Sequence, residues 1–146
     1  MGRIKVLLVD DNEDYCSIVR DYLDMQDDME VVGAAADGLV AMEMIRARKP
    51  DVVLLDLIIP FLDGIGVLKK INLLGSGERP RVIVVSATAH DKITQSVISL
   101  GADYFMIKST AIEMLIDRIR MVVSPLEQNP QHEGINKLGN VVSFYR

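Results

Sequence analysis

The sequence predicts an α/β fold in which helices cover both faces of a parallel β-sheet. Five short apolar runs alternate along the chain with five segments whose apolar residues recur at helical spacing. The runs are continuously apolar, which is typical of strands buried on both faces. This alternation favours five consecutive βα units in one doubly wound sheet.

The predicted strands are rich in Val, Ile and Leu, and charged residues, Gly or Pro border them. They lie at Ile4–Val9, Glu30–Ala36, Asp51–Asp56, Arg81–Ser86 and Tyr104–Ile107. Helices are expected after each strand, at Glu13–Gln26, Leu39–Ala47, Gly64–Leu74, Asp91–Leu100 and from about residue 110 to Val123.

Individual residues support several of these helix boundaries. Asn12 suits an N-cap, and Lys49-Pro50 stops the second helix. Gly101 suits the position just after the fourth helix. Thr110-Ala111-Ile112-Glu113 matches a capping box, which predicts that Thr110 caps the last helix.

The composition excludes several classes of protein. A chain of 146 residues with 49% hydrophobic and 25% charged residues suits one globular domain with a real core. Its net charge of −5 argues against non-specific nucleic-acid binding. A single cysteine, Cys16, excludes an internal disulfide and fits a reducing compartment. Without a membrane-length apolar run or a signal-peptide pattern, we expect a cytoplasmic protein with no membrane partner.

The character of the chain changes at Ser124. Pro, Gly, Asn and Gln crowd the segment that follows, which predicts a domain over residues 1–123 and a linker or tail over residues 124–146. The last residues, from Val141 to Arg146, turn apolar again and suggest the start of another element.

Polar side chains follow four of the predicted strands where those strands end. Asp10-Asp11 follows the first, Asp56 ends the third, Ser86 ends the fourth and Lys108 follows the fifth. In open parallel sheets, ligands bind beyond the carboxyl ends of the strands. We therefore expect these residues to gather in one site.

Three carboxylates in one site repel one another, because two unit charges ~4 Å apart cost about 4 kcal/mol at an effective dielectric constant near 20. A divalent cation removes that cost, and oxygen ligands without a His or Cys cluster favour Mg²⁺. A carboxylate such as Asp56 can also attack phosphorus and form an acyl phosphate. Lys108 and Ser86 supply a charge and a hydroxyl for the phosphoryl group, so the site predicts phosphoryl-transfer chemistry.

In their order, these residues resemble the receiver domain of two-component response regulators over about residues 3–123. The matching landmarks are Asp10-Asp11, Asp56 with Pro60 and Asp63-Gly64, Ser86-Ala87, Gly101-Ala102 before Tyr104-Phe105, and Lys108. The resemblance implies a flavodoxin-like parallel sheet of five strands in the order 2-1-3-4-5.

By this resemblance, Asp56 is the phosphoacceptor. Asp11 is a direct Mg²⁺ ligand, Asp10 is a direct or water-mediated one, and the backbone carbonyl of Ile58 is another; Mn²⁺ or Ca²⁺ could take the place of Mg²⁺. The domain would catalyse only its own Mg²⁺-dependent phosphorylation and a slow autodephosphorylation, and would not be an enzyme. Ile58 lies where the family controls the access of hydrolytic water, so its bulk predicts a slowly decaying phosphate.

The resemblance gives the remaining site residues a role in switching. Ser86 and Lys108 would contact the phosphoryl group, Ser86 would move towards it, and the ring of Phe105 would follow inward. The family usually has proline after its lysine, with a cis bond between them. Here Ser109 follows Lys108, and a cis bond before a non-proline residue costs about 2.5–4 kcal/mol. We therefore predict a trans bond, or a strained cis bond if the site demands one. That departure puts the position of Lys108 in doubt.

Three stretches look most like the stage-zero sporulation response regulator of spore-forming bacteria: Asp10-Asp11-Asn12, residues 28–33 and residues 99–105. This implies a histidine kinase or histidine phosphotransferase as phosphodonor, control of transcription through a DNA-binding output domain outside this chain, and dimerisation on phosphorylation. Two alternatives stay open, a stand-alone receiver or phosphorelay intermediate and a degenerate receiver that acts as a binding scaffold. A Mg²⁺-dependent aspartyl phosphatase needs an acid where this chain has Ile58, which argues against that class.

Overall fold

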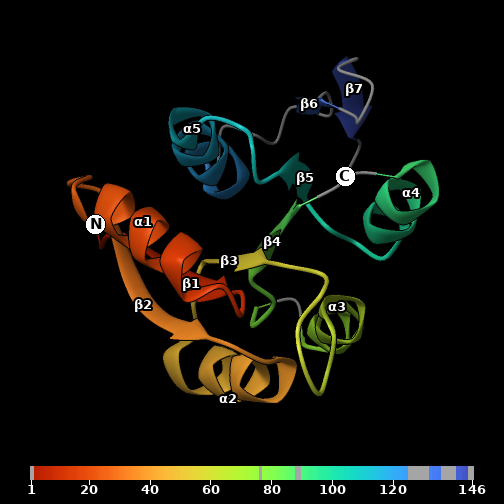
Figure 1. Ribbon diagram of the computed structural model, residues 1–146, viewed down its shortest axis with the longest axis horizontal. Coiled ribbons are helices and arrows are strands. Elements are labelled where there is room, and N and C mark those ends of the chain that lie inside the picture. Colours follow the sequence, from red (N-terminus) through yellow and green to blue (C-terminus); the bar gives the residue numbers. More distant parts are fainter. Residues whose placement is uncertain (1, 76, 88–89, 125–131, 136–140, 145–146) are drawn as a thin grey trace.

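The computed structural model describes residues 2–75, 77–87, 90–124, 132–135 and 141–144, and its centre is one parallel sheet (Figure 1). The strands are β1 (Ile4–Val9), β2 (Met29–Ala35), β3 (Val52–Leu55), β4 (Arg81–Ser86) and β5 (Tyr104–Ile107). They are hydrogen-bonded in the order β2-β1-β3-β4-β5, and every pair is parallel. The predicted fold class and strand order are therefore confirmed.

A helix follows each of these strands. The helices are α1 (Glu13–Asp24), α2 (Gly38–Arg48), α3 (Gly64–Asn72), α4 (Asp91–Ser99) and α5 (Ile112–Val123). Helices α1 and α5 pack on one face of the sheet, and α2, α3 and α4 pack on the other. Among the helices of the described residues, none is both long and apolar enough to cross a bilayer.

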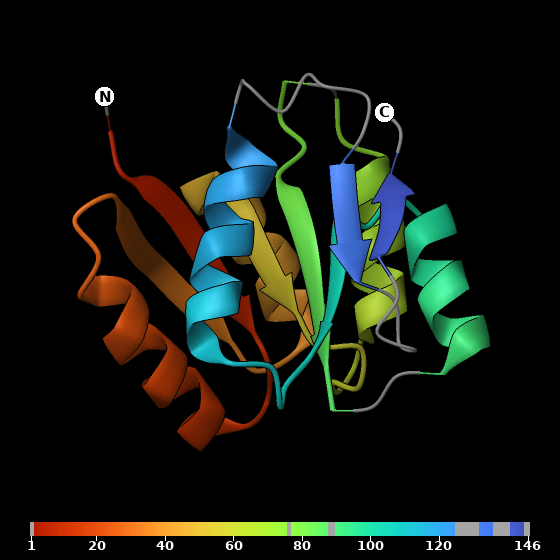
Figure 2. The same cartoon turned by 90° about the horizontal axis from the view of Figure 1, so that it is seen from above.

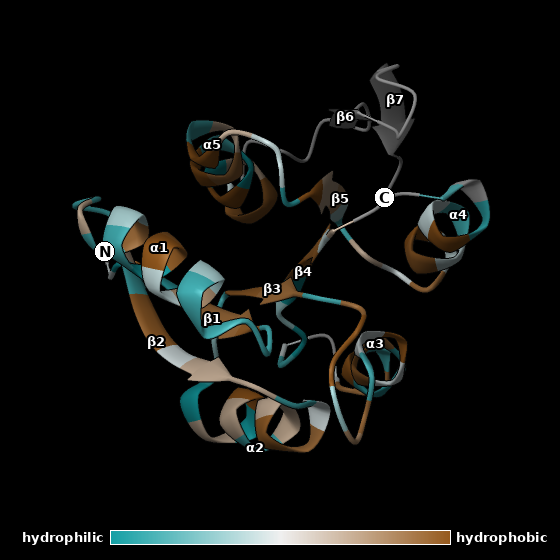
Figure 3. Cartoon of the chain, viewed as in Figure 1, coloured by the Kyte–Doolittle hydropathy of each residue, from teal (hydrophilic) through white to brown (hydrophobic). Residues whose placement is uncertain are grey.

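The core has two layers because the strands are buried on both faces. Successive residues of β3 alternate between them: Val53 and Leu55 join the cluster under α2 and α3, whereas Val52 and Leu54 join the cluster under α1 and α5. Figure 3 shows the resulting distribution, with apolar strands and apolar inner sides on the helices. Burying a Val or Leu side chain contributes about 1.5–3 kcal/mol, so this sheet supplies a rigid frame for its carboxyl edge.

Several helix ends lie where the sequence predicts them. The Asn12 side chain accepts a hydrogen bond from the Tyr15 N–H (3.0 Å) and caps α1. Lys49 ends α2 in a left-handed conformation (φ 46°), and Gly101 follows α4 with φ 95°. Helix α1 ends two residues before the predicted Gln26, and two of its apolar positions, Ile18 and Tyr22, are exposed.

The predicted capping box at the start of α5 is wrong. Ala111 is the N-cap residue of α5, and no side chain caps the helix. The backbone N–H of Thr110 donates to the Ile107 carbonyl (3.0 Å) in a turn that follows β5. The helix then starts one residue later than the motif requires, with the Ala111 carbonyl accepting from the Met114 N–H (3.0 Å).

The C-terminal segment contains a hairpin where the sequence predicts a linker or tail. Strands β6 (His132–Ile135) and β7 (Val141–Phe144) pair antiparallel, and Figures 1 and 2 place them between α4 and α5, beside β5. The apolar end of the chain therefore belongs to a two-stranded element. The predicted tail over residues 125–131, 136–140 and 145–146 lies outside the described residues.

The backbone at the start of α3 lies very close to the backbone at the end of β3. A Cβ atom at Gly64, the first residue of α3, would lie only 2.3 Å from the carbonyl oxygen of Asp56. The Gly64 N–H also donates to the Leu57 carbonyl (2.9 Å). Glycine thus lets the start of α3 lie directly against the end of β3.

We expect Gly64→Ala to lower the free energy of unfolding by about 1–3 kcal/mol, because backbone atoms must move to admit the methyl group. Urea unfolding followed by circular dichroism measures this change. Gly75→Ala is the matched control, since a Cβ at Gly75 would meet nothing within 4 Å. Equal stability of the two variants would contradict the close approach.

Candidate functional site at the carboxyl edge of the sheet

Three carboxylates meet at the carboxyl edge of the sheet. Asp10 and Asp11 directly follow β1, and Asp56 directly follows β3, its neighbour in the sheet. One oxygen of each carboxylate lies within 4.8 Å of the others. Asp10 and Asp56 are buried and Asp11 is exposed. The structure therefore brings the predicted acidic residues together, with one of them facing solvent.

Backbone hydrogen bonds hold the two buried carboxylates in place. The Asp10 N–H donates to the Ala35 carbonyl (3.0 Å), and the Asp56 N–H donates to the Val9 carbonyl (2.9 Å). Asp10 Oδ1 accepts from the Asn12 N–H (2.9 Å), and Asp56 Oδ1 accepts from the Ile58 N–H (3.4 Å). The main chain therefore extends the sheet pairing into the site and orients both side chains.

Lys108 supplies the positive charge of the site from the end of β5. Its Nζ lies 2.7 Å from Asp10 Oδ2 and 3.3 Å from Asp56 Oδ2. Its backbone N–H donates to the Ser86 carbonyl (2.8 Å) and so ties the ends of β4 and β5 together. The bond between Lys108 and Ser109 is trans, as predicted, and Lys108 nevertheless reaches both carboxylates.

The electrostatics of the site follow from burial and from this pairing. Burial raises the pKa of Asp56 above its usual range, and the charge of Asp10 raises it further, against the lowering effect of Lys108. Burial alone would lower the pKa of Lys108, but the hydrogen bond to Asp10 and the charges of Asp10 and Asp56 together raise it. Lys108 stays charged, and Asp56 carries an unfavourable negative charge.

Tyr15 is a site residue that sequence reasoning missed. The Lys108 Nζ lies 4.8 Å from the centre of the Tyr15 ring, a distance at which an ammonium is attracted to an aromatic face. Burial, and then the charge of Asp10, raise the pKa of the Tyr15 hydroxyl to about 12, so the ring stays neutral. Its place in the sequence could have indicated this role, because Tyr15 lies in the first turn of the helix that follows Asp10 and Asp11.

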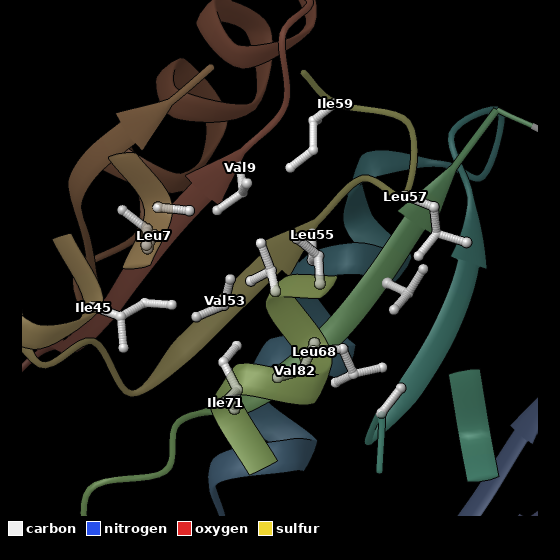
Figure 4. Packing of buried hydrophobic residues seen from close by; sticks show 14 of the residues in the cluster. Leu7, Val9, Ile45, Val53, Leu55, Leu57, Ile59, Leu68, Ile71 and Val82 are labelled. Carbon is white, nitrogen blue, oxygen red and sulfur yellow. The ribbon is translucent and has the colours of Figure 1, made fainter. Parts of the chain in front are cut away.

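The loop between β3 and α3 alternates between the core and solvent. Leu57 and Ile59 are buried in the cluster that also holds Val9 and Leu55 (Figure 4). Ile58, which lies between them in the sequence, is 78% exposed. The anchored neighbours therefore hold Ile58 outward beside Asp56.

The rest of this loop contains an unpredicted backbone conformation. Asp63 caps α3 by accepting from the Gly66 N–H (2.8 Å), which confirms a helix start at this point. Phe61 has a left-handed backbone (φ 66°), and the residue is 85% exposed. Nothing in the sequence pattern indicates either feature of Phe61.

The two predicted switch residues are both buried. Ser86 ends β4 within the site, and Phe105 on β5 packs into the cluster that contains Val97 of α4. Its neighbour Tyr104 points to the opposite core layer, where the Arg118 guanidinium lies 5.1 Å from the centre of its ring. The structure thus gives the two adjacent rings different surroundings, and the switch role of Phe105 stays a prediction.

The donor set of the site fits a hard divalent cation. Asp10, Asp11 and Asp56 offer only carboxylate oxygens, and hard cations such as Mg²⁺ and Ca²⁺ are bound by oxygen. A cation would also relieve the repulsion from Asp10 that, after burial, raises the pKa of Asp56. The cluster can therefore bind a divalent metal.

We expect Asp56→Asn to stabilise the protein at neutral pH in EDTA. Because the folded-state pKa of Asp56 lies above its unfolded value of about 3.9, ionisation of this residue opposes folding. That effect is absent below the unfolded pKa, grows as the pH rises through the folded pKa and is complete above it.

Urea midpoints from pH 3 to pH 8 measure the difference between Asp56→Asn and the natural sequence. Asp21→Asn, an exposed position on α1, is the matched control for the change in net charge. A midpoint for Asp56→Asn no higher than that of the natural sequence at pH 8 would contradict the prediction.

The sequence of this chain matches the model of the response regulator receiver domain family over residues 6–120. That range includes the acidic cluster, Ser86 and Lys108, and it ends within α5.

Solved structures agree with this match. The response regulator domain of CheB from Thermotoga maritima is 35% identical, with a TM-score of 0.76, over 83% of this chain and 96% of that one. The BeF₃-activated receiver domain of RstA from Klebsiella pneumoniae is 27% identical, with a TM-score of 0.74, over 82% and 97%. With most of its length matched by the family model, this chain belongs to the response regulator receiver domain family, the phosphoacceptor modules of two-component signalling.

Proposed function

We propose that this chain stores a signal as a phosphoryl group on Asp56, in a two-component or phosphorelay pathway. The observation that carries the proposal is a buried carboxylate with a lysine ammonium 3.3 Å away and two further carboxylates beside it. This combination suits a nucleophile whose product is an acyl phosphate, because charge stabilisation, more than proton transfer, limits phosphoryl transfer.

The donor in this proposal is the phosphohistidine of a histidine kinase or histidine phosphotransferase. An Asp56 carboxylate oxygen forms the new bond to phosphorus while the bond from phosphorus to the imidazole nitrogen breaks, and that nitrogen keeps the electron pair. Lys108 stays beside the incoming phosphoryl oxygens, and the Ser86 hydroxyl contacts them from the end of β4.

The proposed metal is Mg²⁺, which Mn²⁺ or Ca²⁺ could replace. Asp11 and Asp56 would hold it directly, Asp10 directly or through water, and the Ile58 carbonyl would complete the protein ligands. When bound, the metal neutralises charge on the carboxylates and on the transferred group.

The proposed response is a movement of Ser86 towards the phosphoryl group, followed by the ring of Phe105. Since Phe105 is already buried, we expect a shift within the core under α4, not a passage of the ring from solvent. Dimerisation would follow from such a change of surface.

For the output, we propose control of transcription, in sporulation, through a DNA-binding domain outside this chain. The three sequence stretches that resemble the sporulation regulator support this assignment. We further propose that the protein is cytoplasmic and that it is not a turnover enzyme. A stand-alone receiver is the alternative. The ion pairs that Lys108 makes despite Ser109 favour a phosphoacceptor over a scaffold.

Incubation with phosphoramidate and Mg²⁺ should add the mass of one phosphoryl group, and Asp56→Asn should abolish the addition. Lys108→Ala should slow it about 10²-fold, the usual effect of removing one donor to a developing charge. Lys69→Ala, an exposed lysine on α3, is the matched control. Intact-protein mass spectrometry gives the readout, and labelling of Asp56→Asn at the natural rate would refute the assignment.

A second prediction concerns how long the phosphoryl group lasts. Ile58 lies beside Asp56 with its side chain exposed, where an apolar group hinders the approach of water. Replacement by Asn or Gly should shorten the half-life of the acyl phosphate several-fold. Loss of the label after removal of the donor measures this, and an unchanged half-life in both variants would remove the shielding role.

A further inference from the structure

The side chain of Lys108 is not held in place by close packing. It borders a cavity of about 250 Å³ between α1, β5 and α5, which is lined mostly by apolar side chains such as Ile18, Val85 and Leu115. Apolar side chains do not solvate an ammonium, and a lysine stem is flexible. The place of the Lys108 Nζ must therefore be set by the charged and aromatic groups around it.

Among the described residues, three groups surround that ammonium. Asp10 Oδ2 lies 2.7 Å from it, Asp56 Oδ2 lies 3.3 Å from it, and the centre of the Tyr15 ring lies 4.8 Å from it. In the proposed phosphorylation, Asp56 forms the bond to phosphorus, and Asp10 would also be a ligand of the metal. Tyr15 takes part in neither step, so its ring can stay with the ammonium throughout.

Hydrogen bonds connect the backbone of Tyr15 to the Asp10 carboxylate. Asp10 Oδ1 accepts from the Asn12 N–H (2.9 Å), and the Asn12 side chain accepts from the Tyr15 N–H (3.0 Å). The other Asp10 oxygen pairs with Lys108, whose ammonium lies over the Tyr15 ring. These four residues form a closed circuit, which fixes the ring relative to the carboxylate that Lys108 binds.

Tyr15 also limits the space that is open to the Lys108 side chain. It lines the cavity beside Lys108, and it lines a second, smaller one that Asp10 and Asp56 border. A smaller or more flexible side chain at position 15 would give the Lys108 side chain room to leave its present place.

We propose that Tyr15 is a positioning residue for Lys108, and that its ring face keeps the ammonium beside Asp56 while the phosphoryl group arrives. The share of the ring grows during transfer, because both carboxylates then give up part of their hold on the ammonium. Attraction between an ammonium and an aromatic face is stronger when water is excluded, and the Lys108 side chain is only 19% exposed. This inference rests on the proposed function of Asp56 and adds a residue that acts through Lys108.

Phosphoramidate labelling of single and double variants tests this role. Tyr15→Leu keeps an apolar side chain but removes the ring face, and it should lower kcat/KM about fivefold to tenfold. Tyr15→Phe retains the ring face and should restore the rate to within about twofold of the natural one. In the Lys108→Ala background, Tyr15→Leu should have no further effect, because the ammonium that the ring positions is absent.

The contact also has a spectroscopic signature that does not depend on phosphorylation. The ring current of an aromatic face shifts the proton resonances of a group that lies over it. The ε-methylene protons of Lys108 should show this shift by NMR in the natural chain and in Tyr15→Phe, but not in Tyr15→Leu. Tyr22→Leu, a 43% exposed position on the same helix, is the matched control and should change neither the shift nor the labelling rate.

Urea midpoints establish that each variant is folded before its rate is compared. Labelling of Tyr15→Leu at the natural rate would overturn the proposal. So would an equal slowing by Tyr15→Leu in the natural and Lys108→Ala backgrounds, because a merely structural role would not need the ammonium. A natural chain that phosphoramidate does not label would instead refute the proposed function, and the ring-current shift would still report the contact.

Discussion

The ion pairs of Lys108 with Asp10 and Asp56 are the interaction on which the carboxyl edge of the sheet depends. Two buried carboxylates would otherwise repel each other, at a cost of about 4 kcal/mol for charges ~4 Å apart at an effective dielectric constant near 20. The three residues follow β1, β3 and β5, so one ammonium joins the ends of three strands. A phosphoryl group on Asp56 would compete for that ammonium. The pairing that stabilises the resting edge is therefore the one that a signal must rearrange.

The position of Lys108 does not require the proline that usually follows this lysine in the family. Its backbone N–H bonds to the Ser86 carbonyl (2.8 Å), and the Thr110 N–H bonds to the Ile107 carbonyl (3.0 Å). These bonds fix both ends of the short connection after β5, and Tyr15 borders the ammonium from α1. Local hydrogen bonds and an aromatic contact thus supply an alignment that a trans bond to Ser109 could have lost.

The sequence was most informative where one physical rule decides the outcome. Continuous apolar runs predicted all five parallel strands, and the rule for parallel sheets predicted that Asp10, Asp56 and Lys108 lie at one edge. The capping motif at Thr110 failed because a turn after β5 uses the Thr110 N–H, and a four-residue pattern carries no information about that turn. The hairpin of β6 and β7 was missed because its polar first strand resembles a linker.

Tyr15 and Phe61 escaped prediction for one physical reason. The surroundings of each residue depend on tertiary packing, which a local sequence pattern does not describe. Tyr15 reads as a core position until Lys108 is placed beside it from a strand more than ninety residues later. In the sequence, Phe61 is one of several apolar residues in the loop after β3. Leu57, Ile59 and Leu62 already pack into the core beneath that loop, and its closing hydrogen bonds leave the ring only solvent. The packing of these neighbours, next to the hydrogen-bonded backbone that orients Asp56, therefore leaves Phe61 facing solvent.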